Sequence, residues 1–138
     1  MKVRVRVRVR EEKGEEKMKV NDVSELDVFK KAHDLTLQIY RITNNFPKEE
    51  IYGLTSQMRR ASSSICANLM EGSYRNNSKE FRQFCGIARG SVAELRYFIM
   101  LSKDLGYLGE ELSADLIEST KEVSKMLFGL IKSLESKL

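Results

Sequence analysis

Apolar residues recur every three or four positions through four long segments of this chain, and this spacing constrains the fold more than any other feature. The first segment runs from about Ser24 to Asn45, and its repeat places one apolar stripe on one face of a helix. The members of this stripe are Leu26, Phe29, Ala32, Leu35, Ile39, Ile42 and Phe46. Such a stripe is stable only when another surface covers it, so the pattern predicts helices that pack on one another.

Three further segments repeat the pattern after short breaks. They run from Leu54 to Gly72, from Asn77 to Gly106, and from Gly109 almost to the C-terminus. Short connections make consecutive helices antiparallel neighbours. The sequence therefore predicts an all-α fold, an up-and-down antiparallel four-helix bundle that occupies residues 22–138.

Residues typical of helix ends bound these segments. Ser24 is the expected N-cap of the first helix, and Phe46 ends that helix because it precedes Pro47. Gly72 is the expected left-handed C-cap of the second helix. Asn77 is the expected N-cap of the third helix, with a glutamate three residues later.

Two glycines lie inside the third helix. Gly86 and Gly90 each cost about 1 kcal/mol of helix stability relative to alanine. A pair of such costs in one helix predicts a close contact with another helix.

The first 21 residues break the helical pattern. The run Val3–Arg10 alternates valine with arginine, which is the period of a β-strand, and Glu11–Lys17 is a charged run of low complexity. We interpret residues 1–17 as an extension appended to, or translated upstream of, a chain that begins at Met18. A lone strand has little to pair with, so we expect an extended or disordered tail over residues 1–21. If several copies came together, their strands could pair with one another.

Composition limits the class of protein. Hydrophobic residues make up 41% of the chain and charged residues 32%, which is typical of a globular domain. No apolar run approaches the roughly 18 residues of a membrane span, and the N-terminus lacks the apolar stretch of a signal peptide, so we expect a cytoplasmic protein. The two cysteines, Cys66 and Cys85, are too few for a disulfide framework or a zinc site, and we interpret them as buried small hydrophobes.

Residue combinations typical of catalysis are missing from the sequence. The single histidine, His33, belongs to no Glu-x-x-His or His-Glu-x-x-His motif, and we interpret it as a structural residue with satisfied hydrogen bonds. Glu71 and Glu94 share a groove if their helices are antiparallel. A structural pairing with Arg59, Arg60 or a helix N-terminus is favoured over a catalytic acid–base pair. We predict a protein that is not an enzyme and that holds no cofactor and no metal.

Positive charge is distributed unevenly. Residues 1–17 hold seven Lys/Arg and four Glu, which leaves seventeen basic and sixteen acidic residues in 18–138. Between Arg59 and Arg96, however, seven basic residues stand against three acids. These seven are the candidate nucleic-acid-binding residues: Arg59, Arg60, Arg75, Lys79, Arg82, Arg89 and Arg96. The last five form a stripe down the third helix that suits a phosphate backbone, and the alternative is a solvated face with ion pairs within or between subunits.

Several blocks, in order along the chain, resemble one family of proteins. The resemblance covers about Leu26 to the C-terminus, and residues 1–17 have no counterpart in it. The blocks are Phe46–Glu50, Gly53–Ala61, Ser64–Gly72, Lys79–Phe81, Ala88–Ser91, Ala93–Leu95 and Leu105–Leu108. Together they resemble the four-helix-bundle proteins encoded by intervening sequences in 23S ribosomal RNA genes. Cys66 is a departure, because the family often has proline there, and its presence predicts a less kinked second helix.

The resemblance implies an assembly as well as a fold. It implies a homopentamer, a ring or barrel with a central channel. It also brings in the accessory variability determinant of diversity-generating retroelements, a relative that partners a reverse transcriptase and binds RNA or DNA through basic surfaces. The matched positions have structural or binding roles: Arg59, Arg60, Glu71, Gly72, Gly90, Ser91 and Glu94.

Two functions therefore follow as hypotheses from the sequence. The first is a homo-oligomeric accessory protein, expected to be pentameric, that binds nucleic acid, in particular RNA, and in one branch a reverse transcriptase. The alternative is a structural protein–protein interaction scaffold with no nucleic-acid role, in which the arginines lie inside subunit interfaces.

Overall fold

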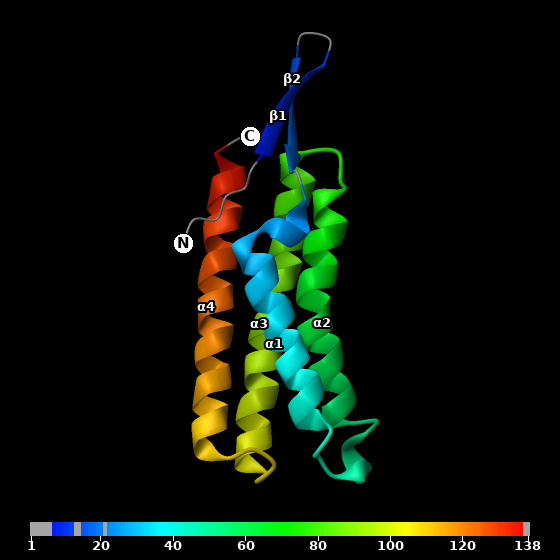
Figure 1. Ribbon diagram of the computed structural model, residues 1–138, viewed down its shortest axis with the longest axis vertical. Helices are drawn as coiled ribbons and strands as arrows, with labels where there is room; N and C mark the ends of the chain where they lie inside the picture. The colour runs from blue at the N-terminus through cyan, green and yellow to red at the C-terminus, as the bar shows by residue number, and fades with distance from the viewer. Residues whose placement is uncertain (1–6, 13–14, 21, 137–138) are drawn as a thin grey trace.

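The computed structural model describes residues 7–12, 15–20 and 22–136, and its main feature is a bundle of four long helices (Figure 1). The helices are α1 (Asp27–Thr43), α2 (Leu54–Ser73), α3 (Ser78–Asp104) and α4 (Glu110–Glu135). Two short 3-10 helices, η1 (Val23–Glu25) and η2 (Lys48–Glu50), precede α1 and α2. The predicted all-α, up-and-down antiparallel bundle is confirmed.

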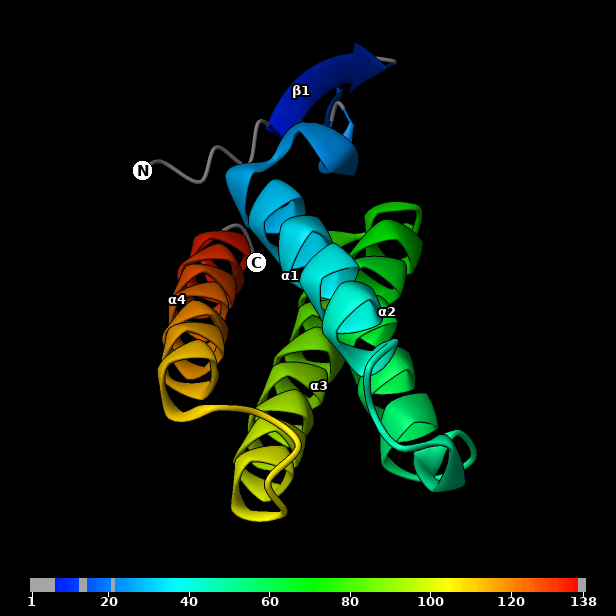
Figure 2. The same cartoon turned by 60° about the horizontal axis from the view of Figure 1, so that its bottom comes forward.

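The four helices are not packed equally closely. Helix α3 lies between α2 and α4 and packs along the length of both, whereas α1 crosses the bundle obliquely and packs more on α2 than on α4 (Figures 1 and 2). The longest seams of the molecule are therefore α2–α3 and α3–α4. Within the described residues, no helix combines the length and the apolar character needed to cross a membrane.

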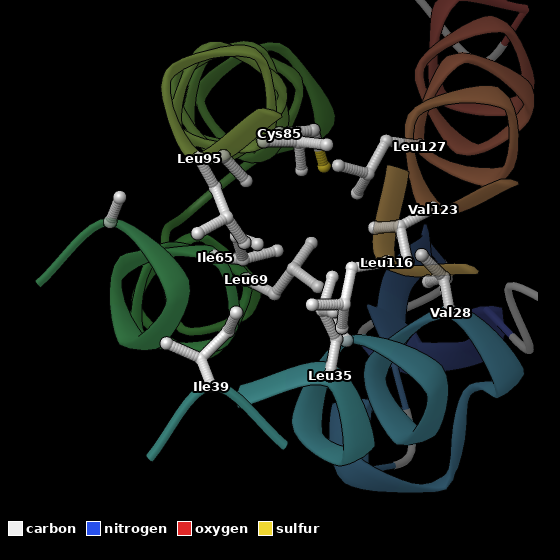
Figure 3. Close-up of a cluster of buried hydrophobic side chains, with 14 of the residues drawn as sticks. Val28, Leu35, Ile39, Ile65, Leu69, Cys85, Leu95, Leu116, Val123 and Leu127 are labelled. Carbon is white, nitrogen blue, oxygen red and sulfur yellow. The ribbon is translucent and has the colours of Figure 1, made fainter. Parts of the chain in front are cut away.

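Buried apolar side chains form a continuous column between the helices (Figure 3). Every helix contributes a stripe at the predicted three- and four-residue spacing, because that spacing returns to the same face of a helix. Burying one leucine or isoleucine stabilises the fold by about 1.5–3 kcal/mol. Among the fully buried side chains are Leu35, Ile39, Ile65, Leu69, Leu95, Ile99, Leu116, Leu127 and Leu130.

Helix α1 begins later than predicted, and Ser24 is not its N-cap. Asp22 instead caps η1, where its Oδ1 accepts hydrogen bonds from the backbone nitrogen of Ser24 at 3.0 Å and from Ser24 Oγ at 2.7 Å. Val23 and Leu26 are both buried, and residues three apart share a face in a 3-10 turn. The need to bury both side chains accounts for this tighter turn.

The connection between α1 and α2 is hydrogen-bonded to the loop between α3 and α4. Helix α1 ends at Thr43, shortly before Pro47, as the sequence predicts. Glu50 of η2 accepts a hydrogen bond from the backbone nitrogen of Leu54 at 2.9 Å and another from Tyr107 Oη at 2.9 Å. Glu50 thereby caps α2 and ties it to the α3–α4 loop.

Gly72 has a role that differs from the predicted left-handed C-cap. It lies inside α2, is buried, and has no positive φ angle. A Cβ at this position would lie 2.6 Å from Phe84 Cβ and 2.9 Å from Phe81 Cδ1. Gly72 is therefore a point of close approach between α2 and α3, and helix α2 continues past it to Ser73.

The ends of α3 match the prediction, but its two internal glycines do not. Asn77 Oδ1 accepts a hydrogen bond from the backbone nitrogen of Glu80 at 2.9 Å, and Gly106 ends the helix with φ +85°. A Cβ on Gly86 or Gly90 would meet nothing within 4 Å. The predicted close helix contact is therefore wrong within one protomer, because both glycines lie on the outer face of α3.

The N-terminal segment forms a hairpin, so the predicted strand is not alone. Strand β1 (Val7–Glu12) pairs antiparallel with β2 (Glu15–Val20) in a register that places Val7 opposite Val20. We expected no partner for this strand within the chain. Its partner, β2, begins in the charged run and continues to Val20. The rest of the valine–arginine alternation lies outside the described residues.

Candidate nucleic-acid interface

Three of the predicted arginines lie together on the seam between α3 and α4. Arg82, Arg89 and Arg96 are seven residues apart, which is close to two helical turns, so they share one side of α3. Because α4 runs antiparallel to α3, their partners on α4 occur in reverse order. Arg82 Nη1 lies 3.2 Å from Glu135 Oε2, Arg89 Nε donates to Ser124 Oγ at 3.1 Å, and Arg96 Nε donates to Thr120 Oγ1 at 3.1 Å.

These contacts orient the arginines without neutralising most of them. Within the part of the chain that the structure describes, Arg82 alone of the three meets a carboxylate, whereas Arg89 and Arg96 are held by hydroxyl oxygens. A hydroxyl accepts a hydrogen bond but carries no charge. Two full positive charges therefore remain on the surface of this seam.

Three lysines of α4 extend the positive surface, and the sequence reasoning missed them. Lys121, Lys125 and Lys132 are exposed, and with Phe128 they follow one another at steps of four, three and four residues. Residues at these steps share one face of a helix, and Phe128 faces α3. That spacing was the signal available in the sequence. We call the following six residues the basic seam: Arg82, Arg89, Arg96, Lys121, Lys125 and Lys132.

The acidic residues of α4 lie on both sides of the helix, and exposed Glu118 lies one turn before Lys121 on the side of the seam. Glu122 pairs with Lys31 of α1 at 3.0 Å, so it points away from the basic seam. Glu135 pairs with both Arg82 and Lys132, at 3.2 and 3.5 Å. Among the described ion pairs, Glu135 is the carboxylate that meets the seam, and the nearby Glu118 side chain adds a second negative charge beside Lys121.

Phe128 lies in the middle of the basic seam and is 46% exposed. Arg89 Cζ lies 5.0 Å from the centre of its ring, and Lys132 Nζ lies 5.8 Å from it. Cations at this distance are attracted by the negative face of an aromatic ring. The seam therefore combines positive charge with an accessible aromatic surface.

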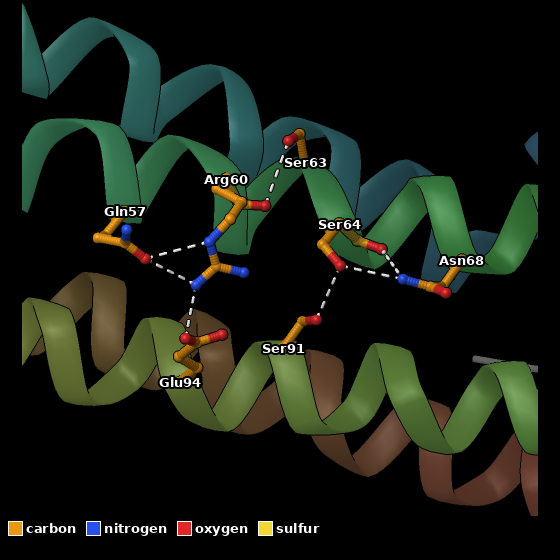
Figure 4. A network of polar contacts seen from close by, with 7 residues as sticks. All are labelled: Gln57, Arg60, Ser63, Ser64, Asn68, Ser91 and Glu94. Carbon is orange, nitrogen blue, oxygen red and sulfur yellow. Dashed lines mark hydrogen bonds and ion pairs between the residues drawn. The ribbon is translucent and has the colours of Figure 1, made fainter. Parts of the chain in front are cut away.

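Two of the predicted binding residues belong to other seams. Arg59 reaches α1, where it donates to Thr43 Oγ1 at 2.9 Å, to the Tyr40 carbonyl at 3.2 Å and to Asn44 Oδ1 at 3.1 Å. Arg60 reaches α3, where it pairs with Glu94 (Figure 4). The structure therefore separates both residues from the basic seam.

The remaining two predicted residues lie at the start of α3. Arg75 pairs with Glu71 at 3.1 Å and stacks over the ring of Phe84 at 4.8 Å. Lys79 is exposed and has no ion-pair partner among the described residues. The predicted set of seven is thus not one site, and its α3 members from Arg82 onwards form the part that comes together.

A comparison of the sequence with protein families identifies the chain's relatives. A family model described as 23S rRNA-intervening sequence protein matches residues 24–129. The chain belongs to this family. No curated protein matches it. A solved structure of a protein with unknown function from the S23 ribosomal protein family of Bacteroides thetaiotaomicron is similar at 22% sequence identity and a TM-score of 0.70. The similarity covers 76% of this chain and 95% of that one, and at this identity it supports the fold alone.

Several positions that match the 23S rRNA-intervening sequence protein family connect α2 to α3 in this member. Ser64 Oγ and Ser91 Oγ lie 2.9 Å apart, and Asn68 Nδ2 donates to Ser64 Oγ at 3.0 Å (Figure 4). Together with the Arg60–Glu94 pair they form a polar ladder above the core. These positions act in helix packing, as does Gly72.

Glu71 and Glu94 do not share a site in this family member. Each is paired with a different arginine, Glu71 with Arg75 and Glu94 with Arg60. Glu71 lies beside Gly72, which contacts Phe84, so about ten residues of α3, or roughly 15 Å, separate the two carboxylates. The predicted pairing is confirmed for Glu94, whose partner is Arg60, whereas the partner of Glu71 is Arg75, which was not among the predicted partners.

The other candidate reactive groups are dispersed. His33 is exposed on α1, and its interpretation as a structural residue stays a prediction. Cys85 is fully buried and Cys66 half-buried, and burial raises the pKa of each thiol to about 12. In the part of the chain that the structure describes, no three His, Cys, Asp or Glu side chains group as a metal site would require.

Proposed function

We propose that this protein is a non-enzymatic, homo-oligomeric four-helix bundle that binds nucleic acid, in particular RNA, along the α3–α4 seam. The observation that carries the proposal is the basic seam itself. It gathers six cations from two helices around the exposed ring of Phe128, and one carboxylate, Glu135, offsets part of that charge.

The dimensions of the seam suit a phosphate backbone. Arg82 and Arg96 are fourteen residues apart on α3, which is about 21 Å along the helix axis. At the roughly 3.4 Å spacing of phosphates along one stacked strand, that length covers about six phosphates. Side chains that are already oriented by Ser124 and Thr120 lose less conformational entropy when they bind.

Family membership supports RNA as the polyanion. The description of the family refers to intervening sequences in 23S ribosomal RNA, and this description associates its members with loci that encode RNA. The reverse-transcriptase partner implied by the resemblance stays a prediction, as does the ring of five copies. A ring would repeat the seam in every copy, and repeated weak sites raise the overall affinity.

Two exposed lysines allow a direct test of the seam. Lys121→Gln with Lys125→Gln removes two charges that make no ion pair among the described residues, so folding should be unaffected. We expect the variant to bind single-stranded oligouridylate more weakly, with a log–log salt slope reduced by about 0.7 for each lost phosphate contact.

The matched control removes two exposed cations from α1. Lys30→Gln with Arg41→Gln changes the net charge by the same amount on α1, outside the basic seam. Its RNA affinity should exceed that of the seam variant. Equal affinities in the two variants would mean that RNA responds to net charge alone, and the seam would not be the site.

A second candidate function, a protein-interaction scaffold, is favoured by the outer face of α3. The outer face of α3 carries the uncharged residues Gly86, Gly90, Ala93 and Tyr97, and Glu94 and Arg89 border it. Ile87, Tyr97 and Met100 on or beside this face are 53%, 57% and 47% exposed. Exposed apolar surface of this kind is typical of interfaces. Self-association through this face would also build the proposed homo-oligomer.

Substitutions at two glycines with open surroundings distinguish this scaffold role from RNA binding. Gly90→Arg adds a charged side chain to the outer face of α3, and Gly129→Arg adds one to α4, and neither Cβ meets an atom within 4 Å. Light scattering should show a smaller particle for Gly90→Arg and an unchanged one for Gly129→Arg. If both variants keep the mass of the original chain, this face does not join the subunits.

A further inference from the structure

We propose that Phe128 and Arg89 form a stacking site for an unpaired nucleobase, so that the seam takes single-stranded nucleic acid. This inference rests on the proposed function, because the basic seam must first hold the phosphate backbone. It adds a ligand chemistry that charge alone does not specify.

The exposure of Phe128 is the first observation. Nearly half of this large apolar side chain faces solvent, on a helix surface that also carries Lys121, Lys125, Lys132 and, at its end, Glu135. Proteins that bind single strands combine a positive groove with aromatic rings on which bases stack. Phe128 is placed as such a ring, between the lysines of one helix and the arginines of the other.

The hydrogen bonding of Arg89 is the second observation, and it distinguishes this pair from the other arginine–aromatic pairs. Arg59 stacks over Tyr40, but its guanidinium already donates three hydrogen bonds to α1. Arg75 stacks over Phe84, but it is paired with the Glu71 carboxylate. By contrast, no carboxylate of the described residues pairs with the guanidinium of Arg89, which stacks over Phe128.

The position of Arg89 is nevertheless fixed. Its Nε donates to Ser124 Oγ at 3.1 Å, and its Cζ lies 5.0 Å from the ring centre of Phe128. Both Nη groups make no hydrogen bond within the described residues, so they are free to donate to a phosphate. One residue therefore offers a flat surface for a base and two donor groups for the backbone that carries the base.

Base pairing would block this use of the seam. In a duplex the bases are stacked on one another and their faces are covered, whereas bases of single strands stack on aromatic and guanidinium planes. A base that stacks on Phe128 must therefore be unpaired. Sequence-specific recognition of RNA by proteins mostly targets unpaired loops and single strands.

Tryptophan fluorescence in the full chain gives a local test. The chain has no tryptophan, so Phe128→Trp places a single fluorophore at the stacking site. The probes are oligothymidylate and an abasic oligodeoxynucleotide of the same length, which has the same phosphates but no bases. We expect oligothymidylate to quench the indole fluorescence of the Phe128→Trp variant strongly and the abasic probe to leave it nearly unchanged. Tyr52→Trp, at a position that is 93% exposed on the η2–α2 turn, is the control that neither probe should quench.

Affinity gives the second readout. Phe128→Leu keeps an apolar side chain but removes the ring, and we expect it to weaken oligothymidylate binding about fivefold or more while binding of the abasic probe is unchanged. If oligothymidylate binds without quenching and Phe128→Leu binds it as tightly as the original chain, the stacking site is refuted and the basic seam stands. If the original chain binds neither probe at low salt, both the stacking site and the proposed function are refuted.

Discussion

Gly72 of α2 faces Phe84 of α3 so closely that a Cβ on the glycine would lie 2.6 Å from Phe84 Cβ. A Cβ at position 72 and the Cβ of Phe84 are each bonded directly to a helix backbone, so neither could move without moving its helix. We predict that Gly72→Ala destabilises the bundle by about 1–3 kcal/mol, as overpacked cores do. The measurement is the free energy of unfolding in urea.

Gly129→Ala is the matched control for that substitution. Gly129 also lies inside a helix, but a Cβ there would meet nothing within 4 Å. Alanine is favoured over glycine in a helix by about 1 kcal/mol, so this variant should be more stable than the original chain. Gly72→Ala with unchanged or increased stability would show that α2 and α3 are not packed at this distance.

Arg59 should affect stability and leave RNA binding unchanged. Its guanidinium holds α1 through Thr43 Oγ1, the Tyr40 carbonyl and Asn44 Oδ1. Hydrogen bonds to a charged group contribute about 1.5–3 kcal/mol, and this site is partly exposed, so we expect Arg59→Gln to cost about 1–2 kcal/mol. Urea unfolding of Arg59→Gln beside Arg41→Gln measures this cost, and a larger effect of Arg41→Gln would contradict the assigned contacts.

Tyr107 should titrate later than an ordinary tyrosine. Its hydroxyl donates to Glu50 Oε2 at 2.9 Å, and this bond to a carboxylate raises the pKa of the phenol above its usual value of 10.0. Because the folded pKa is raised, the contact stabilises the fold fully below pH 10 and its contribution is lost as the pH rises through the folded pKa.

Ultraviolet titration of the phenols measures this directly. One of the five tyrosines should ionise after the others, and Tyr107→Phe should remove that late step. Tyr52→Phe should leave it in place. If the late step persists in Tyr107→Phe, another phenol carries the shift and the hydrogen bond to Glu50 is not formed in solution.

The two thiols should react slowly in the folded protein. Burial raises the pKa of Cys66 and of Cys85 to about 12, so little thiolate exists at pH 8, and the thiolate is the reactive form. We expect a thiol-reactive dye to label both residues only as the chain unfolds in urea. The variant Cys66→Ala isolates Cys85, and rapid labelling of that variant without urea would place Cys85 outside the core.

The fold was predictable because its main determinant is periodic. Leu35 and Ile39, or Leu127 and Leu130, lie at helical steps, and no other secondary structure buries such a pattern on one face. Gly72 was misinterpreted because a glycine near a helix end suits either a left-handed cap or a tight contact, and only the position of Phe84 decides between them. The late start of α1 likewise depends on burial of Val23 and Leu26, which is a tertiary effect.

The candidate site was predictable only in part. The heptad steps of Arg82, Arg89 and Arg96 correctly placed them on one side of α3, because that is a property of one helix. Lys121 and Lys125 lie beside these arginines because of the face that α4 packs against α3. That face cannot be read from a single sequence. Arg59 was included because it is basic, but its role follows from the neighbouring α1.

The hairpin needs to be separated from the bundle before any RNA affinity is assigned to the seam. An isolated two-stranded hairpin is marginally stable in water, and the register of β1 and β2 opposes like charges, for example Arg8 with Lys19 and Glu11 with Glu16. Among residues 22–136, whose burial the structure describes, the core begins at Val23. We therefore expect residues 18–138 to fold with the same helical content as the full chain.

RNA binding by residues 18–138, measured across a range of salt concentrations beside the full chain, tests the central claim most directly. The basic seam predicts that the shortened chain binds oligouridylate, with log affinity falling linearly with log salt concentration, and that Lys121→Gln with Lys125→Gln weakens this binding. A shortened chain that folds but binds no RNA, while the full chain binds it, would contradict the claim and assign the binding to the arginines of the Val3–Arg10 run.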